Sequence, residues 1–279
     1  MKFANLHLHS TYSDGGFTPS QLVLIGKSLG YSALALTDHE TDGGCREFMK
    51  HAKNEGIQSV SGCEFYGKED GVTLHLTALD FDQENAPLRA YIKERVDGYN
   101  EYTRLCVEYG IQNGFIDGIT WNDVTDIAKD GAWICIDTVL LTMNIKKAIP
   151  DNFTEQEFRK NVFKVPELMA KKHKTPPAEK VIRLVRDAGG VIALAHPYKQ
   201  THFVQKLVSY GLNGIEVSHP DLYENSAYLA LEAAETFNLY KCGGTDHTGA
   251  MSCCGGRLAI PALQGITEEE FTILKERRL

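Results

Sequence analysis

Short apolar runs alternate with amphipathic segments through the first part of the chain. The runs with the length and composition of buried strands are Phe3–His9, Ser32–Thr37, Ile57–Ser61 and Thr73–Phe81. Helical spacing of apolar residues occupies two of the intervals between them, at Leu22–Leu29 and Cys45–Asn54. Strands separated by helices of this length are typical of βα units, so the pattern predicts a parallel sheet or a barrel.

The pattern changes between residues 85 and 175, where no strand signal interrupts a series of helices. These helices are predicted at Leu88–Tyr109, Trp121–Ala128, Thr138–Lys147 and Phe153–Phe163. We therefore expect a helical insertion over residues 85–175. Its end, Phe158–Lys174, contains six basic residues and one acid. That run is typical of a solvated face, and it also suits a lid that closes over a substrate.

The strand–helix alternation resumes after Pro176 and Pro177. The predicted strands are Val191–Ala195, Gly214–Val217, Leu239–Gly243 and a short Gly255–Ile260. The predicted helices are Ala178–Ala188, Phe203–Tyr210, Ser226–Thr236 and Glu268–Arg277. The sequence thus predicts an α/β fold in which residues 1–84 and 176–279 form one domain and residues 85–175 are inserted into it.

Composition narrows the class of protein. With 43% hydrophobic and 24% charged residues, the 279-residue chain is an ordinary globular protein. No apolar run approaches the ~20 residues of a membrane span, and the N-terminus lacks the layout of a secretion signal. Seven cysteines without a CxxC pair predict reduced, buried thiols. We expect a cytoplasmic protein without membrane contact and without an obligate protein partner.

The net charge of −8 argues against a surface that coats nucleic acid. The insertion carries 13 basic and 13 acidic residues, so the whole net charge belongs to the rest of the chain. An anionic substrate therefore requires local positive charge at its binding site.

Histidines and carboxylates gather where the predicted strands end. They are His7, His9, Asp14, Asp38, His39, Glu64, His75, His196, Asp246 and His247. In β/α barrels the loops after the strands meet at one rim, where active sites assemble. Imidazoles mixed with carboxylates suit Mn²⁺, Zn²⁺ or Fe²⁺. The number of groups exceeds the ligands of one ion, so we expect two or three divalent ions bridged by a carboxylate such as Glu64.

Each residue also has a plain structural explanation. A lone histidine such as His75 on an apolar strand is more often a hydrogen-bonded core residue than a ligand. Several strands that each end in such a group are not explained in this way, because unpaired buried polar groups cost several kcal/mol. His51, His173 and His202 lie outside the pattern. His219 follows the strand at Gly214–Val217 and is a candidate substrate-binding or proton-transfer group.

The motifs resemble those of the PHP (polymerase and histidinol phosphatase) superfamily. They are His7-Leu8-His9-Ser10, Ser13-Asp14-Gly15, Thr37-Asp38-His39, Gly62-x-Glu64, His75, Ala195-His196-Pro197 and Gly244-Thr245-Asp246. The resemblance spans residues 1–81 and about 176–260, and it implies a distorted, TIM-like (β/α)₇ barrel with a two- or three-metal site. The helical insertion resembles that of the phosphoesterase branch acting on nucleotides and short RNA.

The resemblance also implies a set of ligands for each ion. One metal would be held by His7, His9, Glu64 and Asp246, and a second by Glu64, His75 and His196. Asp14 and His39 would hold a third, together with a histidine two residues after the last aspartate. This chain instead reads Asp246-His247-Thr248. Either His247 reaches the third ion through a shifted loop, or that ion is weakly bound or absent.

These inferences predict a hydrolase that cleaves a small phosphate monoester, a nucleotide or phosphosugar, with a metal-bridging hydroxide. A cyclic phosphodiester or the 5′ end of a short oligonucleotide is the nearest alternative, and a non-catalytic, metal-stabilised binding module is another. An amidohydrolase would normally have a lysine that bridges its metal ions. No lysine lies at the end of a predicted strand before the insertion, which argues against this activity.

Five further residues are assigned roles in this reaction. Lys199 and Arg257 are candidate contacts to the substrate phosphate, and Asp38 is expected to orient His39. His219, His247 or metal-bound water would supply the proton to the leaving oxygen.

Overall fold

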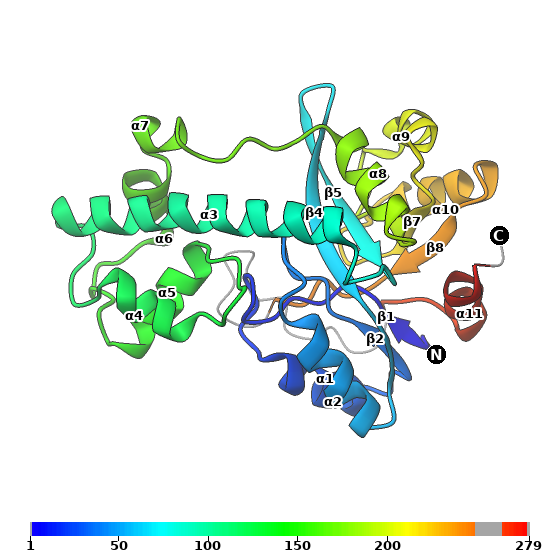
Figure 1. Ribbon diagram of the computed structural model, residues 1–279, viewed down its shortest axis with the longest axis horizontal. Helices are drawn as coiled ribbons and strands as arrows, with labels where there is room; N and C mark the ends of the chain where they lie inside the picture. The colour runs from blue at the N-terminus through cyan, green and yellow to red at the C-terminus, as the bar shows by residue number, and fades with distance from the viewer. Residues whose placement is uncertain (1, 249–263, 278–279) are drawn as a thin grey trace.

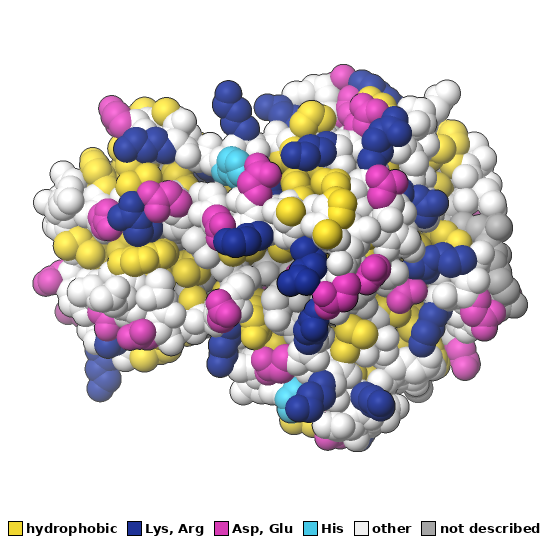
Figure 2. Space-filling model, in the orientation of Figure 1, with side chains coloured by type: hydrophobic (Ala, Val, Ile, Leu, Met, Phe, Trp, Pro, Cys, Tyr) yellow, Lys and Arg dark blue, Asp and Glu magenta, His cyan; other side chains and the backbone are white. Residues whose placement is uncertain are grey.

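The computed structural model describes residues 2–248 and 264–277. The chain has a part built on two β-sheets, and a helical lobe that extends from it along α3 (Figure 1). Within the described residues, none of the helices combines the length and the hydropathy required to span a bilayer. Basic and acidic side chains are interspersed over the face shown in Figure 2, so the net charge does not gather there in one patch.

The first sheet is small and parallel. Its strands, in spatial order, are β1 (Ala4–Asn5), β2 (Ala33–Ala35) and β3 (Gln58–Val60). The helices α1 (Pro19–Ser28) and α2 (Cys45–Asn54) connect these strands and pack on each other. Thr18 caps α1 in a capping box with Gln21, as expected for a Thr-Pro-x-Gln start. This region therefore follows the predicted βα pattern.

The second sheet has five strands and mixed direction. In spatial order they are β4 (Gly62–Glu69), β5 (Val72–Leu79), β6 (Val191–Leu194), β7 (Gly214–Ser218) and β8 (Tyr240–Gly243). Only β6, β7 and β8 are parallel to one another. The strands β4 and β5 form an antiparallel hairpin, and β5 is also antiparallel to β6. The prediction of a parallel sheet is therefore wrong for β4 and β5.

A two-residue turn explains the hairpin. Asp70 and Gly71 have φ angles of 45° and 84°, the left-handed pair that a type I′ turn requires. The hydrophobic pattern did not predict strand β4, because its sequence, GCEFYGKE, mixes glycine and charged residues with apolar ones. The hairpin has a consequence for the site: Glu64 and Tyr66 on β4 pair with Thr77 and His75 on β5.

Helices cover the second sheet on its outer side. They are α8 (Ala178–Asp187), η2 (Thr201–Phe203), α9 (Val204–Tyr210) and α10 (Ser226–Thr236), and α11 (Glu268–Glu276) packs on β8. A separate hydrophobic cluster includes Ala33 of β2, Leu79 of β5, Tyr240 of β8 and Phe271 of α11. One core thus joins the two sheets. The predicted strand Gly255–Ile260 lies outside the described residues.

The class of fold is a mixed α/β structure, as predicted. The described strands form two sheets rather than one closed barrel. Backbone hydrogen bonds nevertheless join the segments that follow β1 and β8: Leu6 N donates to Gly243 O (3.0 Å), and Asp246 N donates to His7 O (2.9 Å). These bonds hold together the two segments that carry metal-ligand candidates.

The predicted helices of residues 85–175 are present. They are α3 (Ala86–Gln112), α4 (Trp121–Ile127), α5 (Ile136–Ile145), α6 (Glu155–Phe158), the π-helical η1 (Arg159–Phe163) and α7 (Pro166–Met169). They enclose a hydrophobic cluster of their own, which includes Val107, Val139 and Val162. In Figure 1 the long α3 runs from the sheets to the far end of this lobe.

A buried ion pair joins α3 to the sheets. Arg95 Nε lies 2.7 Å from Glu40 Oε2, and the two side chains are 2% and 0% exposed. Glu40 follows His39 directly and also accepts a hydrogen bond from Tyr66 N (2.8 Å). Arg95 additionally donates to the carbonyl of Lys174 (2.9 Å). The pair therefore connects the helical lobe to a residue next to the candidate metal site.

We predict that Arg95→Met destabilises the protein by about 3–5 kcal/mol, because it leaves the buried Glu40 carboxylate without its partner. Denaturant unfolding followed by circular dichroism measures the change. The control is Lys93→Met, which removes the exposed Lys93–Asp97 pair on the same helix and should cost at most about 1 kcal/mol. Equal losses in the two variants would contradict the assignment.

Candidate metal centre

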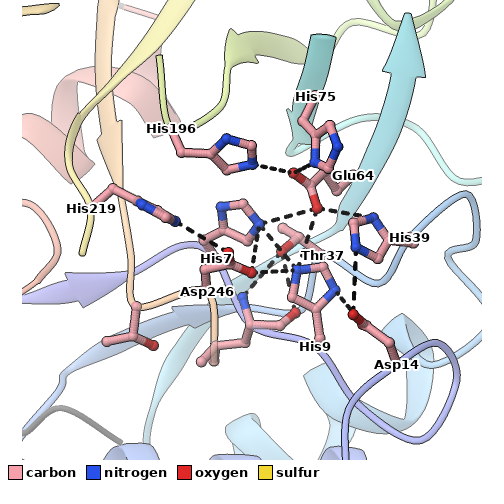
Figure 3. A network of polar contacts seen from close by, with 12 residues as sticks. His7, His9, Asp14, Thr37, His39, Glu64, His75, His196, His219 and Asp246 are labelled. Atoms are coloured by element: carbon pink, nitrogen blue, oxygen red, sulfur yellow. Dashed lines mark hydrogen bonds and ion pairs between the residues drawn. The ribbon is translucent and has the colours of Figure 1, made fainter. Parts of the chain in front are cut away.

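Histidines and carboxylates from both sheets converge on one point (Figure 3). His7 and His9 lie in the extended segment after β1, two residues apart, and both are fully buried. The others follow or lie within separate strands: His39 after β2, Glu64 in β4, His75 in β5, His196 after β6 and Asp246 after β8. Six strands thus contribute to a single cluster.

Glu64 stands at the centre of this cluster. Its Oε1 lies 2.9 Å from His75 Nδ1 and 3.1 Å from His196 Nε2. Its Oε2 lies 3.0 Å from His39 Nδ1, 3.3 Å from His7 Nε2 and 3.4 Å from His9 Nε2. The two oxygens of one carboxylate therefore face two different sets of histidines, which is the arrangement of a bridging ligand.

Two aspartates complete the cluster. Asp246 Oδ1 lies 3.0 Å from His9 Nε2 and 3.6 Å from His7 Nε2. The other carboxylate, Asp14, lies 3.4 Å from His9 Nδ1 and 3.7 Å from His39 Nε2. Its contacts are the longer ones, so the ligand candidates of the third predicted position are less closely gathered than those around Asp246.

The backbone is adapted to this arrangement. A Cβ on Gly244 would lie 2.4 Å from His7 N, so glycine is required for the segment after β8 to come this close. His196 and Asp246 both have left-handed φ angles, 29° and 49°, which are uncommon for residues other than glycine. Such conformations are held at functional sites at a cost of about 1–3 kcal/mol.

The electrostatics of the cluster favour cations. Burial opposes a charge on His9, but Asp14, Asp246 and Glu64 outweigh it and raise its pKa to about 9. Burial likewise disfavours the Glu64 carboxylate, yet the surrounding histidines, above all His7, lower its pKa well below the ordinary value. A site that retains protons on a buried imidazole at neutral pH has a strongly negative potential.

The donor set fits divalent metal ions. His7 Nε2 and His9 Nε2 face each other at 3.1 Å, a contact that requires a proton or a cation between the two nitrogens. Among the described residues, four groups have ligand atoms close enough together to hold an ion. Three of them are His7, His9 and Asp246; Glu64, His75 and His196; and His9, His39 and Glu64. Imidazole and carboxylate ligands in this mixture suit Zn²⁺, Mn²⁺ or Fe²⁺.

Glu216 is a site residue that the sequence pattern did not reveal. It is fully buried on β7, and its Oε1 lies 2.8 Å from His7 Nδ1. Its Oε2 accepts a hydrogen bond from His196 N (2.7 Å). A carboxylate that binds the outer nitrogen of a ligand histidine fixes its tautomer and turns Nε2 toward the metal. The only signal in the sequence was one acid within the apolar strand Gly214–Ser218.

His219 is oriented by the backbone. Its Nδ1 accepts a hydrogen bond from Asp221 N (3.0 Å), so the neutral ring carries its proton on Nε2. Nε2 lies 3.4 Å from Asp246 Oδ2. A nitrogen that carries a proton cannot bind a metal, and we therefore do not count the nearby group of His7, Glu216 and His219 as a cation site.

The remaining predicted residues lie elsewhere. The Asp38 carboxylate accepts hydrogen bonds from Ser10 N (2.7 Å), Ser10 Oγ (2.7 Å) and Ser13 Oγ (2.5 Å), and His39 is not among its contacts. The ring of His247 stacks on that of Phe17, with centroids 5.5 Å apart. Lys199 is exposed, with Nζ 4.8 Å from the Tyr198 ring centroid, and Arg257 lies outside the described residues.

The chain matches a known protein family and is similar to several curated proteins. The family model of the PHP domain matches residues 5–228. A 5′-3′ exoribonuclease of Haemophilus influenzae is 27% identical, with 87% of this chain and 88% of the relative aligned. A phosphoribosyl 1,2-cyclic phosphate 1,2-diphosphodiesterase of Eggerthella lenta is 25% identical, over 88% of this chain and 94% of the relative.

Two further similarities concern a curated relative and a crystal structure. A 3′,5′-nucleoside bisphosphate phosphatase of Chromobacterium violaceum is 24% identical, with 87% of this chain and 86% of the relative aligned. A crystal structure described as a putative metal-dependent phosphoesterase of Bifidobacterium adolescentis superposes with a TM-score of 0.81 at 21% identity, covering 100% of this chain and 97% of the other. That structure therefore shares the fold.

We predict that Glu216→Gln lowers metal affinity roughly 10–100-fold, because the neutral amide no longer holds His7 and His196 in their ligand orientations. Isothermal titration with Mn²⁺ measures the affinity. Glu232→Gln, an exposed change on α10, is the matched control and should bind like the wild type. Unchanged affinity in Glu216→Gln would show that this carboxylate has no part in the metal site.

Proposed function

The chain belongs to the PHP domain family and is a metal-dependent phosphoesterase, and we propose that its substrate is a small phosphate monoester, a nucleotide or a phosphosugar. The bridging position of Glu64 carries this proposal, since its two oxygens contact two sets of histidines. A pair of ions sharing one carboxylate is suited to the hydrolysis of phosphate esters.

The choice of a monoester rests on charge. A phosphate monoester is mostly dianionic at neutral pH, since its second pKa is about 6, whereas a diester carries one charge. Two or three divalent ions therefore stabilise the monoester more strongly. The second candidate is a cyclic phosphodiester or the 5′ end of a short RNA. It is supported by the names of the relatives from Eggerthella lenta and Haemophilus influenzae.

We propose two metal ions held firmly by the cluster, with a third position at Asp14 and His39. The first would be held by His7, His9, Glu64 and Asp246, and the second by Glu64, His75 and His196. The third position is the weaker one, because the Asp14–His39 contact is 3.7 Å. Mn²⁺, Zn²⁺ and Fe²⁺ all suit these ligands.

We also propose that the two sheets are arcs of a distorted barrel. One hydrophobic cluster that includes residues of both sheets supports this proposal.

In the reaction, bound divalent ions would activate water and neutralise the phosphate oxygens. The protein's own groups act around them. Glu216 keeps the His7 proton on Nδ1, so that Nε2 stays available as a ligand. Asp38 ties Ser10 and Ser13 together and so fixes the turn that presents Asp14. Both residues are positioning residues in this proposal.

His219 is the candidate donor to the leaving oxygen. Burial lowers its pKa, so the ring is neutral at pH 7. A neutral ring with the proton on Nε2 donates a hydrogen bond rather than transferring its proton, as a neutral imidazole does in an oxyanion site. We propose that Nε2–H stabilises the negative charge that develops on the departing oxygen, and that the proton itself comes from water.

The test of the proposed function is phosphate release from nucleoside and sugar mono-, bis- and cyclic phosphates with Mn²⁺. We expect turnover of monoesters, loss of turnover in EDTA, and its return on adding Mn²⁺. His9→Ala should abolish both metal binding and turnover, because His9 contacts Glu64, Asp246 and Asp14. His51→Ala, an exposed change on α2, should alter neither. Turnover of diesters without turnover of monoesters would favour the second candidate.

For His219 we predict that His219→Gln lowers kcat about 100-fold for an alkyl phosphate, as expected for the loss of an oxyanion donor. The loss should be much smaller for p-nitrophenyl phosphate, because its leaving oxygen needs little stabilisation. KM should hardly change for either substrate. An equal loss for both esters would instead indicate that His219 acts by positioning Asp246.

A further inference from the structure

An aromatic pocket lies in the helical lobe, beside the metal centre. It has a volume of about 220 Å³ and is lined by residues that include Tyr99, Tyr102, Trp133 and Phe163. Trp133 is the link to the metal centre, because its ring centroid lies 5.5 Å from that of His39. The function proposed above does not use this pocket.

The aromatic walls are held in place. Trp133 N donates to Tyr12 O (2.8 Å), and Thr103 Oγ1 donates to Ile134 O (2.7 Å), so the segment around Trp133 is bound to both parts of the chain. The Tyr99 ring meets Trp133 edge-on, with centroids 5.3 Å apart. The Tyr102 hydroxyl donates to the carbonyl of Phe163. These rings therefore form a preformed surface for a planar group.

The charged residues of the pocket are all basic. They are Arg159, Lys164 and Lys172, and no acid is among the lining residues. Neither lysine forms an ion pair within residues 2–248 and 264–277, whereas Arg159 pairs with Glu155. Lys172 Nζ lies 5.9 Å from the Tyr99 ring centroid and 5.8 Å from that of Tyr102. In a chain of net charge −8, this local excess of positive charge indicates an anionic ligand.

We infer that this pocket is a second subsite, which takes the planar base of the substrate and a second anionic group, while the phosphate to be hydrolysed lies at the metal centre. This inference rests on the proposed function, and it selects a nucleotide with a second phosphate over a phosphosugar. The pocket is below the ~300 Å³ at which sites for drug-sized ligands begin, so it encloses one ring system. The exposed Lys164 and Lys172 leave the anionic group at the mouth of the pocket.

Binding can be measured without metal and without turnover. The chain has two tryptophans, so the Trp121→Phe protein reports on Trp133 alone. In EDTA we expect adenosine 5′-monophosphate to quench this fluorescence in a saturable way, and ribose 5-phosphate to leave it unchanged. Adding Lys172→Ala should weaken nucleotide binding about tenfold, whereas Lys171→Ala, an exposed neighbour, should not. No quenching, or equal quenching by both compounds, would overturn the subsite.

Kinetics with Mn²⁺ provide the second measurement. Trp133→Ala and Lys172→Ala should raise KM for adenosine 3′,5′-bisphosphate about tenfold, the equivalent of one lost base stack, with kcat little changed. Trp133→Phe should restore most of the loss, and kcat/KM for ribose 5-phosphate should not move. Equal losses for both substrates would reject the subsite and leave the proposed function intact. Failure of the wild type to hydrolyse any ester, with quenching present, would reject the function and support the pocket.

Discussion

One buried carboxylate organises this protein. Glu64 is 1% exposed, and a carboxylate in such a place is stable only if cationic or hydrogen-bonding groups surround it. Five histidines meet this requirement, and they come from four separate segments of the chain. The ends of the strands must therefore meet at Glu64, whatever the helices and loops between them do. The site also favours the binding of cations, because four carboxylates lie among the imidazoles. They are Asp14, Glu64, Glu216 and Asp246.

Buried carboxylates around the cluster hold its ligand candidates in position. Glu216 orients His7 from behind, while Asp38 holds the turn that carries Asp14. On the other side, the buried pair of Glu40 and Arg95 joins the long helix α3 to the segment next to His39. The helical lobe is thus connected to the metal centre by charge as well as by packing. Any movement of α3 would have to carry or break a buried ion pair.

Charge also explains how an acidic chain acts on phosphate esters. The net charge of −8 belongs to the part that builds the metal centre, where the carboxylates favour divalent cations. Bound cations invert the local potential and attract the phosphate. The helical lobe has no net charge, but its lysines border the aromatic pocket at Trp133. A substrate with a base and two phosphates would meet positive charge at both ends.

The helices and most of the strands could be predicted from the sequence, because the spacing of apolar residues is a local property that follows the period of each element. The same spacing predicted a set of metal-ligand candidates at the ends of the strands. It did not reveal the antiparallel hairpin of β4 and β5, whose turn depends on two left-handed residues at Asp70 and Gly71. Which partner each polar group meets follows only from the tertiary structure. Asp38 faces two serines, Glu216 reaches His7 and His247 packs on Phe17, since such contacts join residues far apart in the chain.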